Sequence, residues 1–452
     1  MKTYQDLEKV RDNDRDLCAF LLALKNDHEG SEMVRTARDA DLYDRQKNPG
    51  IDRFYKEYAA AMRKAEVFQT ESKRPDAQKC NLFRRLTTQR TVYLTGNGVA
   101  FDDEAQKEKL GVKFDNAVKK ATKLAIIHGL CFGFWNRDKL EIFPLTEAAP
   151  LWDEENGHLR AVMRYWRLDD EKPLHVTLYT ETGYRNFRTE NNRGSQLFPV
   201  EQNEKPYLYS TTTTAAGGTE VTDVGGYSSL PIVPLWGSEL KQSALVGLER
   251  GIDAFDIIAS GFVSTVEEAA EVFWLVENYG GMTRDDLKEW LTRARTDHII
   301  TADTSSGGKI TPYTQPVPVD ARQASLAHLK AQLYEDFGGL DVHTVSADST
   351  NDHLEAAYQP MDEEADDLEY QLIEWILQIE KVAGLPESVP TFKRDKVSNV
   401  KEQVEIVLLE AEYLDDDTIL DKLPNITPDE KEKILAARQA ERAAMMELPE
   451  VE

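Results

Sequence analysis

The residues best suited to chemistry form a short run of carboxylates. This run contains Asp362, Glu363, Glu364, Asp366, Asp367 and Glu369. Carboxylates gathered in this way can hold divalent cations, which would suit a metal-dependent nuclease or another hydrolase. At helical spacing directly after Pro360, the same run is more typical of a solvated helix start, where the helix macrodipole favours acidic side chains. Structural use is the preferred interpretation, and hydrolysis at this cluster is the alternative function.

Other groups that could do chemistry give weaker signals. His343 and His353 flank a polar loop and could form a metal site, although two solvent-exposed loop histidines are the commoner case. The chain lacks a phosphate-binding P-loop, a zinc-protease helix motif, a nucleophile elbow and a dinucleotide fingerprint. Its three cysteines are widely separated and predict neither a disulfide framework nor a zinc site. The sequence therefore predicts no enzyme and no cofactor.

Charge is unevenly distributed along the 452 residues. The net charge is −27, from 81 acidic and 54 basic residues, which argues against a protein that simply grips phosphates. No Lys or Arg occurs between Ala331 and Glu380, so this block must face water, cations of a neighbour, or something that it repels. A cluster of basic residues precedes this block, formed by Lys73, Arg74, Lys79, Arg84, Arg85 and Arg90. We expect this basic concentration to pair with acidic residues of a neighbouring subunit in preference to DNA.

Two long helices should position these groups. The first is predicted from Glu239 to about Val266 and the second from Asp320 to Phe337, each with an apolar stripe. Ala244, Gly247 and Gly251 lie one turn apart on the first helix, so we expect a neighbouring helix to approach closely there.

A small mixed insert separates the two helices. Its aromatic residues are interpreted as a small core or, less favourably, as a partner surface; they are Trp274, Tyr279, Trp290 and Tyr313.

The rest of the chain reads as helices followed by strands, then helices again. Charged helices are expected up to residue 78, and a buried helix from Cys80 should stop at a Gly96-Asn97-Gly98 turn. Strands follow, with residues 210–226 predicted as a polar loop. After Gly339 come a polar loop and a helix broken by Pro360. The predicted fold class is α+β, predominantly helical. No apolar run of 18 residues exists and no signal peptide is recognisable, so a soluble protein without a membrane partner is expected.

Several phrases in this order carry a family resemblance. They are the helix Cys80 to Phe101, Ile127-His128-Gly129 before the FGFW strand, LPIVP from Leu230, and DDDTILDKLPNITPDEKEKI near the end. Together they resemble the portal proteins of tailed bacteriophages with long non-contractile tails. The resemblance implies a portal fold with a wing (1–235), stem helix 1 (236–266), clip (267–319), stem helix 2 (320–340), tunnel loop (341–353), kinked spine helix (354–384) and crown (385–452).

The resemblance also implies a function and a set of partners. Such a protein would form a ring of about twelve copies at one capsid vertex, and double-stranded DNA would pass through its channel during packaging and ejection. The terminase large subunit would dock on it, and later a head-completion or adaptor protein. Major capsid and scaffolding proteins are further expected partners. The expected locations are the virion and, during assembly, the host cytoplasm.

Three groups of site residues follow from these expectations. The tunnel loop should face DNA with neutral or acidic side chains that do not trap phosphates: Asp341, His343, Thr344, Ser346, Asp348, Ser349, Thr350, Asn351 and Asp352. Stem packing between copies should use Ala244, Gly247 and Gly251. A partner surface on the clip would be built from Trp274, Tyr279, Trp290 and Tyr313.

Overall fold

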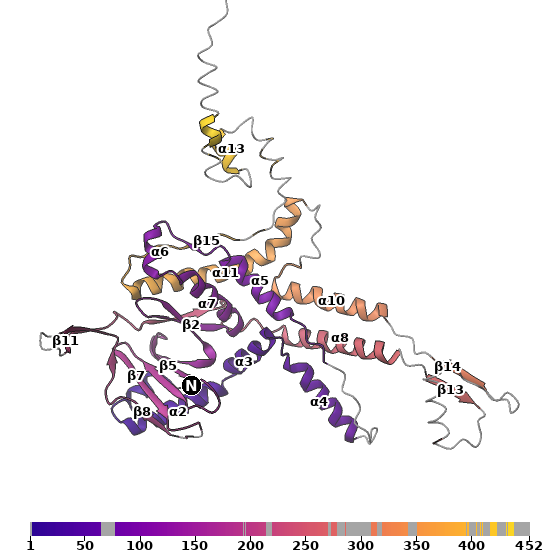
Figure 1. Ribbon diagram of the computed structural model, residues 1–452, viewed down its shortest axis with the longest axis horizontal. Helices are drawn as coiled ribbons and strands as arrows, with labels where there is room; N and C mark the ends of the chain where they lie inside the picture. Colours follow the sequence, from indigo (N-terminus) through magenta and orange to yellow (C-terminus); the bar gives the residue numbers. More distant parts are fainter. Residues whose placement is uncertain are drawn as a thin grey trace, which may run out of the picture. The chain divides into compact units, whose positions relative to one another are not determined.

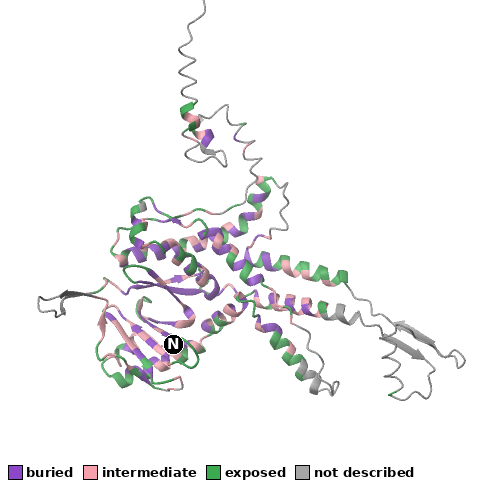
Figure 2. Cartoon of the chain, in the orientation of Figure 1, coloured by how far each residue is buried: buried purple, intermediate pink, exposed green. Residues whose placement is uncertain are grey.

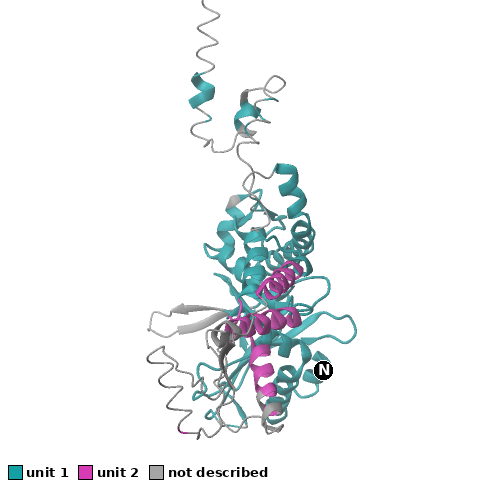
Figure 3. Ribbon diagram, turned by 90° about the vertical axis from the view of Figure 1, so that its right-hand side faces the viewer, with its two compact units in different colours: residues 1–45, 81–248, 334–452 teal, residues 46–80, 249–333 magenta. Residues whose placement is uncertain are grey.

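The computed structural model describes most of the chain (Figure 1). The described residues are 2–64, 77–192, 194, 196–213, 219–269, 273–277, 285, 309–313, 319–341, 350–394, 396 and short stretches between 404 and 437. They fall into two compact units, coloured in Figure 3. The larger unit contains residues 1–45, 81–248 and 334–452, and the smaller contains residues 46–80 and 249–333. Strands and helices both contribute, as the predicted α+β class requires.

The larger unit begins with helices that pack on a sheet. Helix α1 spans Tyr4–Glu8, α2 spans Asp14–Gly30 and α3 spans Glu32–Asp44. The Asn13 side chain accepts from the first amides of α2, and Ser31 does the same for α3, which fixes both helix starts. The apolar face of α2 is buried against a six-stranded antiparallel sheet, ordered β4-β5-β6-β7-β8 with β9 also paired to β7. Its strands are β4 (Ala148–Trp152), β5 (Leu159–Trp166), β6 (His175–Tyr179), β7 (Gly183–Thr189), β8 (Leu197–Pro199) and β9 (Lys205–Pro206).

A second sheet forms the centre of the larger unit. It is ordered β12-β2-β3, from Ile232–Trp236, Leu130–Trp135 and Leu140–Pro144. Three helices bury their apolar faces around it: α5 (Leu82–Thr95), α7 (Phe114–His128) and α11 (Asn351–Ala383). Trp375 of α11 is 1% exposed, and its Nε1 donates to the Val233 carbonyl over 3.1 Å. Gly133 lies beneath this ring, where a Cβ would come within 2.5 Å of it, so the close approach of helix and strand requires glycine.

Smaller elements complete this unit. They are β1 (Val99–Ala100), paired with β15 (Thr391–Phe392), α6 (Glu104–Leu110), the 3₁₀ turn η1 (Leu145–Glu147) and α13 (Asp416–Lys422). The predicted polar loop over residues 210–226 is wrong. Strands β10 (Leu208–Thr213) and β11 (Thr219–Gly225) pair there as an antiparallel hairpin, because the threonines and valines favour extended backbone.

Helix α11 is continuous through Pro360. The prediction that Pro360 interrupts the helix is therefore wrong. Figure 1 shows, however, that the helix changes direction along its length. Proline inside a helix removes one backbone hydrogen bond and bends the helix without having to end it. The helix ends where Gly384 adopts a left-handed conformation with φ 71°. Figure 2 shows a buried side of α11 facing the central sheet and an exposed side away from it.

Within its described residues, the smaller unit contains three helices and a strand pair. Helix α4 spans Pro49–Lys64, α8 spans Glu249–Ala269 and α10 spans Val319–Phe337. The last turn of α10, from Tyr334 onward, belongs to the larger unit. Strands β13 (Phe273–Glu277) and β14 (Lys309–Tyr313) pair in antiparallel. The predicted bounds of the second long helix, Asp320 to Phe337, are confirmed to within one residue.

The predicted start of the first long helix at Glu239 is wrong, because α8 begins ten residues later. The backbone before Glu249 is held by the end of α7 instead. Ala244 N donates to the Ile126 carbonyl over 3.0 Å, and the Ser243 hydroxyl donates to the Ile127 carbonyl over 2.5 Å. Gly247 has φ 92°, which interrupts any helix at that position.

Candidate assembly and conduit surfaces

The carboxylate run on α11 is neutralised by cations from a distant segment. Arg394 donates to Asp362 Oδ1 over 2.8 Å and to Glu369 Oε2 over 2.9 Å, and it also contacts Asp366. These three carboxylates lie four and three residues apart on one side of the helix, so one guanidinium reaches all of them. Lys396 Nζ adds a contact to Asp362 Oδ2 at 2.6 Å. The contacts of Arg394 and Lys396 with α11 were not predicted, because ion pairs between separate segments leave no local pattern in the sequence.

Hydrogen bonds within this cluster shift the pKa values of Asp362 and Arg394 in opposite directions. Burial acts to raise the pKa of Asp362, but hydrogen bonds from Lys396, Tyr93 and Arg394 outweigh it and hold that pKa below its usual range. Burial acts to lower the pKa of Arg394, and its bonds to the carboxylates raise it above the ordinary value. Tyr93 donates to Asp362 Oδ1 over 2.5 Å, and burial followed by this bond raises the pKa of the phenol.

The paired cluster is a poor match to a cation site for hydrolysis. Its oxygens already accept charged hydrogen bonds, so a divalent ion would have to displace Arg394 and Lys396. Among the residues that the structure describes, no three or more His, Cys, Asp or Glu side chains are placed to hold a metal ion. The arrangement instead fixes the segment after Ser388 to the side of α11.

Arg90 binds Glu364 from the opposite flank of the same run. Its Nη1 lies 3.0 Å from Glu364 Oε2, its Nη2 donates to the Phe337 carbonyl, and its guanidinium lies 4.0 Å from the centre of the Phe337 ring. Burial lowers the pKa of Arg90, while Glu364 and Asp367 oppose that shift. The side chain thus caps the last turn of α10, where orphan carbonyls favour a cation.

Gln89, the neighbour of Arg90, holds the backbone at Leu340, directly before the predicted tunnel loop. Its Nε2 donates to the Leu340 carbonyl over 2.8 Å, and its Oε1 accepts from Leu340 N over 3.2 Å. No such role was expected for Gln89 from the sequence, because its partner Leu340 lies 251 residues away in the chain.

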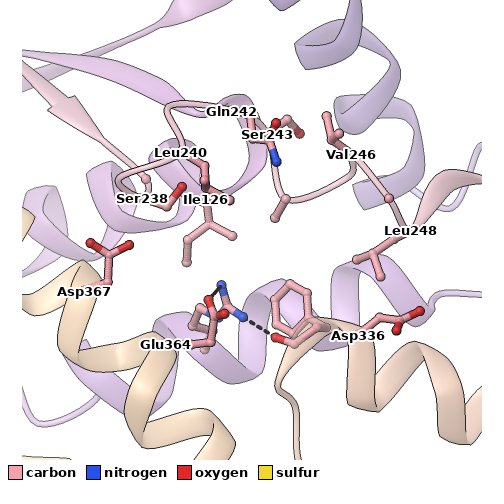
Figure 4. Close-up of a pocket in the computed structure, with 15 residues that line it drawn as sticks. Ile126, Ser238, Leu240, Gln242, Ser243, Val246, Leu248, Asp336, Glu364 and Asp367 are labelled. Atoms are coloured by element: carbon pink, nitrogen blue, oxygen red, sulfur yellow. Dashed lines mark hydrogen bonds and ion pairs between the residues drawn. The ribbon is translucent and has the colours of Figure 1, made fainter.

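A cavity of about 470 Å³ opens beside Arg90 (Figure 4). Asp336, Glu364 and Asp367 line one side, and the segment from Gly237 to Leu248 lines the other. Asp367 accepts from Glu239 N over 3.1 Å, so the segment and α11 are linked at its rim.

The three predicted stem-packing residues occupy different settings. Ala244 is partly buried against the central core, and Gly247 lies before α8 with open space where a Cβ would stand. Gly251 lies in α8, where a Cβ would come within 2.9 Å of Leu333 Cδ2 of α10. Close helix approach therefore occurs at Gly251 within one chain, while packing between copies at all three positions stays a prediction.

Helix α8 makes further polar contacts within the smaller unit. Arg322 of α10 donates to the Gly261 carbonyl of α8 over 2.7 Å. Asp256 of α8 is buried and accepts from Cys80 N over 2.8 Å and from Asn48. Burial raises the pKa of Asp256, although those two donors act in the opposite direction. One turn later, the Ser260 hydroxyl accepts from Gln78 N, so residues 78 to 80 are held along α8.

The predicted tunnel loop is described only at its two ends. Asp341 follows the segment held by Gln89, and Thr350 precedes Asn351 and Asp352 in the first turn of α11. His343, Thr344, Ser346, Asp348 and Ser349 lie outside the described residues. Of the aromatic residues predicted for the clip, Trp274 pairs with Pro312 and Tyr313 pairs with Phe273 across β13 and β14, whereas Tyr279 and Trp290 lie outside the described residues.

The basic concentration is partly used within the chain. Lys79 Nζ lies 2.6 Å from Asp52, Arg90 binds Glu364, and Arg85 lies over the Tyr334 ring at 5.9 Å. For Lys79 and Arg90, the expected pairing with a neighbouring subunit is thus replaced by an internal partner. Lys73 and Arg74 lie outside the described residues.

The comparison with family models shows which protein family the chain belongs to. Residues 38–444 match the model of the phage portal protein family described as SPP1 Gp6-like. The chain belongs to the phage portal protein family. Portal proteins are structural components of virions, which agrees with a carboxylate cluster bound by arginine and lysine.

Individual portal proteins confirm the relationship. The portal protein of Clostridium phage phiCD119 is 24% identical over 416 residues, covering 83% of this chain and 88% of the relative. The portal protein of Bacillus phage SPP1 is 22% identical over 294 residues, covering 61% of this chain and 55% of that relative. In the described part of the chain, no helix combines the length and apolarity needed to cross a membrane.

Proposed function

We propose that this chain is the subunit of a ring of about twelve copies at one capsid vertex, through which double-stranded DNA is packaged and ejected. The family match over residues 38–444 carries this proposal, because it extends across both compact units and both stem helices. Under the proposal the protein acts in the virion and assembles in the host cytoplasm. The ring, the channel and the site at the vertex are the parts that experiment must establish.

The smaller unit supports self-assembly on physical grounds. Its helices leave apolar side chains exposed within one copy, including Phe54 and Tyr58 on α4 and Val263 on α8. Phe54 and Tyr58 are stacked with ring centres 6.3 Å apart, so they present one aromatic face. Exposed apolar helix faces of this kind are stabilised when neighbouring copies cover them.

The acidic block supports a conduit that does not hold DNA tightly. Within the described ends of the proposed tunnel loop, Asp341 and Asp352 are acidic and Thr350 and Asn351 are neutral. Each Lys or Arg that contacts a phosphate adds binding free energy through counterion release, which would slow sliding. A lumen that offers acidic and neutral groups avoids this retention.

The proposed partners follow from the same assignment. The region 267–319 would form the docking surface for the terminase large subunit and then for a head-completion or adaptor protein, with Trp274 and Tyr313 in its strand pair. Major capsid and scaffolding proteins would contact the ring at the vertex. The family resemblance supports these partners, and no contact with them is visible in a single chain.

Negative-stain electron microscopy and light scattering of the purified chain test the proposal. We expect rings with a central channel and a mass of about twelve subunits. A stable monomer or dimer at high concentration in Mg²⁺ would contradict it. Nuclease assays with and without chelator form the companion measurement, and Mg²⁺-dependent cleavage lost in Asp362→Asn would instead favour the hydrolase alternative.

A further inference from the structure

A basic groove lies between α3, α5 and α7 of the larger unit. We call it the α5–α7 groove; its volume is about 620 Å³ and its floor contains Val92, Leu124 and Ile127. Five basic residues line it: Arg45, Arg84, Lys119, Lys120 and Lys123. Two acidic residues at its edge are already engaged, since Asp44 lies 3.0 Å from Lys123 and Asp41 lies 3.0 Å from His128. In the part of the chain that the structure describes, Arg84, Lys119 and Lys120 form no ion pair.

This lining is unusual for a chain with a net charge of −27. Exposed cations above an apolar floor repel one another unless an acidic group lies between them. Apolar floors with a charged rim typically receive an amphipathic helix whose polar face has the opposite charge. The groove therefore fits an acidic helix that also carries an apolar anchor.

The outward face of α11 has this composition. Glu355, Glu363, Tyr370 and Glu374 follow one another at intervals of eight, seven and four residues on the side away from the core. Tyr370 is 73% exposed, whereas most other large apolar side chains of α11 are buried. Among the described residues, Glu363 and Glu374 accept hydrogen bonds from glutamines of their own helix, at 3.3 and 3.2 Å, and belong to neither the Arg394 nor the Arg90 cluster.

Helix α5 separates the two surfaces. Its side with Gln89, Arg90 and Tyr93 contacts Leu340, Phe337 and α11. Its other side, with Arg84 and Val92, lines the groove. The outward face of α11 points away from α5, so one copy cannot place that face in its own groove. Two different complementary surfaces on opposite sides of one unit join copies head to tail, and such contacts form a ring when the rotation between copies closes.

We propose that the outward face of α11 docks in the α5–α7 groove of the next copy, with Tyr370 against Val92, Leu124 and Ile127. Glu363 and Glu374 then pair with Arg84, Lys119 and Lys120 of that copy. This inference rests on the proposed ring and names the contact that joins neighbouring subunits. Because these pairs are at the rim of an interface, they set the register and orientation of the copies more than the total affinity.

Charge reversal tests the contact. Lys119→Glu with Lys120→Glu, and separately Glu363→Lys with Glu374→Lys, should each raise the protein concentration needed for half-assembly by about tenfold or more. The four substitutions together should restore assembly, since the charges are exchanged. Arg167→Glu with Lys172→Glu, at exposed positions in the β5–β6 turn, is the matched control and should leave assembly unchanged. Analytical ultracentrifugation measures the ring fraction, and circular dichroism verifies folding of each variant.

Carbodiimide cross-linking of wild-type rings supplies a second readout that does not depend on variants. Mixing ¹⁴N- and ¹⁵N-labelled subunits before assembly should yield mixed-isotope peptides that join Lys119 or Lys120 to Glu363 or Glu374. If both charge-reversed variants still form rings and wild-type rings yield no such peptides, the docking contact is overturned while the proposed ring stays intact. Wild-type protein that forms no ring would overturn the proposed function itself.

Discussion

Arg394 joins three carboxylates of α11 through a single guanidinium, and its side chain is only 21% exposed. Removing it would leave the mostly shielded Glu369 without this cation, and Asp362, also mostly shielded, would keep only its contact with Lys396 among these two basic partners. We expect Arg394→Ala to lower the free energy of unfolding by about 1–3 kcal/mol, the range for hydrogen bonds to charged groups. Urea unfolding measures this change.

Arg167→Ala is the control for that experiment, because Arg167 is exposed and stands in a turn. It should change the free energy of unfolding by less than about 0.5 kcal/mol. Equal effects from the two substitutions would show that the Arg394 cluster contributes nothing specific to stability.

His28 supplies a second prediction at this scale. Its Nδ1 lies 3.0 Å from the Tyr165 hydroxyl, and burial lowers the pKa of the ring to about 4. An unfolded histidine titrates near 6.5, so between about pH 4 and 6.5 the unfolded chain binds more protons than the folded chain. Stability must therefore fall as pH is lowered through this window, by up to about 1.4 kcal/mol per pH unit.

His28→Leu should reduce that slope between about pH 4 and 6.5. Denaturant unfolding at several pH values measures it in wild type and variant. His158→Leu, at an exposed position in the turn before β5, should leave the slope unchanged. An unaltered slope in His28→Leu would mean that other groups account for the loss of stability in acid.

Two glycines of α8 differ in their surroundings. A side chain at Gly251 would meet Leu333 of α10, whereas one at Gly261 would meet nothing within 4 Å. We expect Gly251→Leu to destabilise the helical hairpin by about 1–3 kcal/mol through overpacking. Gly261→Ala should stabilise α8 by up to about 1 kcal/mol in the isolated subunit. Thermal unfolding of unassembled protein compares the two.

The two substitutions, Gly251→Leu and Gly261→Ala, also distinguish an effect on folding from an effect on assembly. If Gly261 faces a neighbouring copy at close range, Gly261→Ala will fold normally and still disturb the ring. Normal folding of Gly251→Leu would contradict the close approach to Leu333.

Sequence patterns predicted the presence of helices better than the residues at which they begin and end. Both long helices of the stem were expected from their apolar periodicity, because burying one stripe is a local property of the chain. The first began late because Ser243 and Ala244 bond to the end of α7, a contact between distant segments. The hairpin β10–β11 was missed since glycine and threonine in polar surroundings resemble a loop. Arg394 was missed because its partners lie on another element.

At the scale of the whole molecule, passage of DNA is the property to test. Replacing Asp348 and Asp352 together by Lys should leave ring assembly intact and slow packaging, because new cations in the lumen would bind phosphates. The slowing should be greater at low salt, where the Debye length is longer. A packaging assay at two salt concentrations measures it.

Lys substitution at the exposed acidic residues Asp169 and Asp170, in the β5–β6 turn, adds the same charge elsewhere and serves as the control. Packaging at the wild-type rate by the Asp348 and Asp352 double variant, at both salt concentrations, would show that the loop does not approach DNA.

The accessibility of the three thiols of this chain determines where fluorescent dyes can be attached to follow its assembly. Cys18 and Cys131 are buried, and burial raises the pKa of both thiols, so maleimide dyes should react with them slowly. Only Cys80 is partly accessible. Cys80→Ser would therefore give a nearly silent background for labelling. Donor and acceptor dyes at Lys120→Cys and Glu374→Cys could then report, by energy transfer between separately labelled subunits, how quickly copies exchange between complexes.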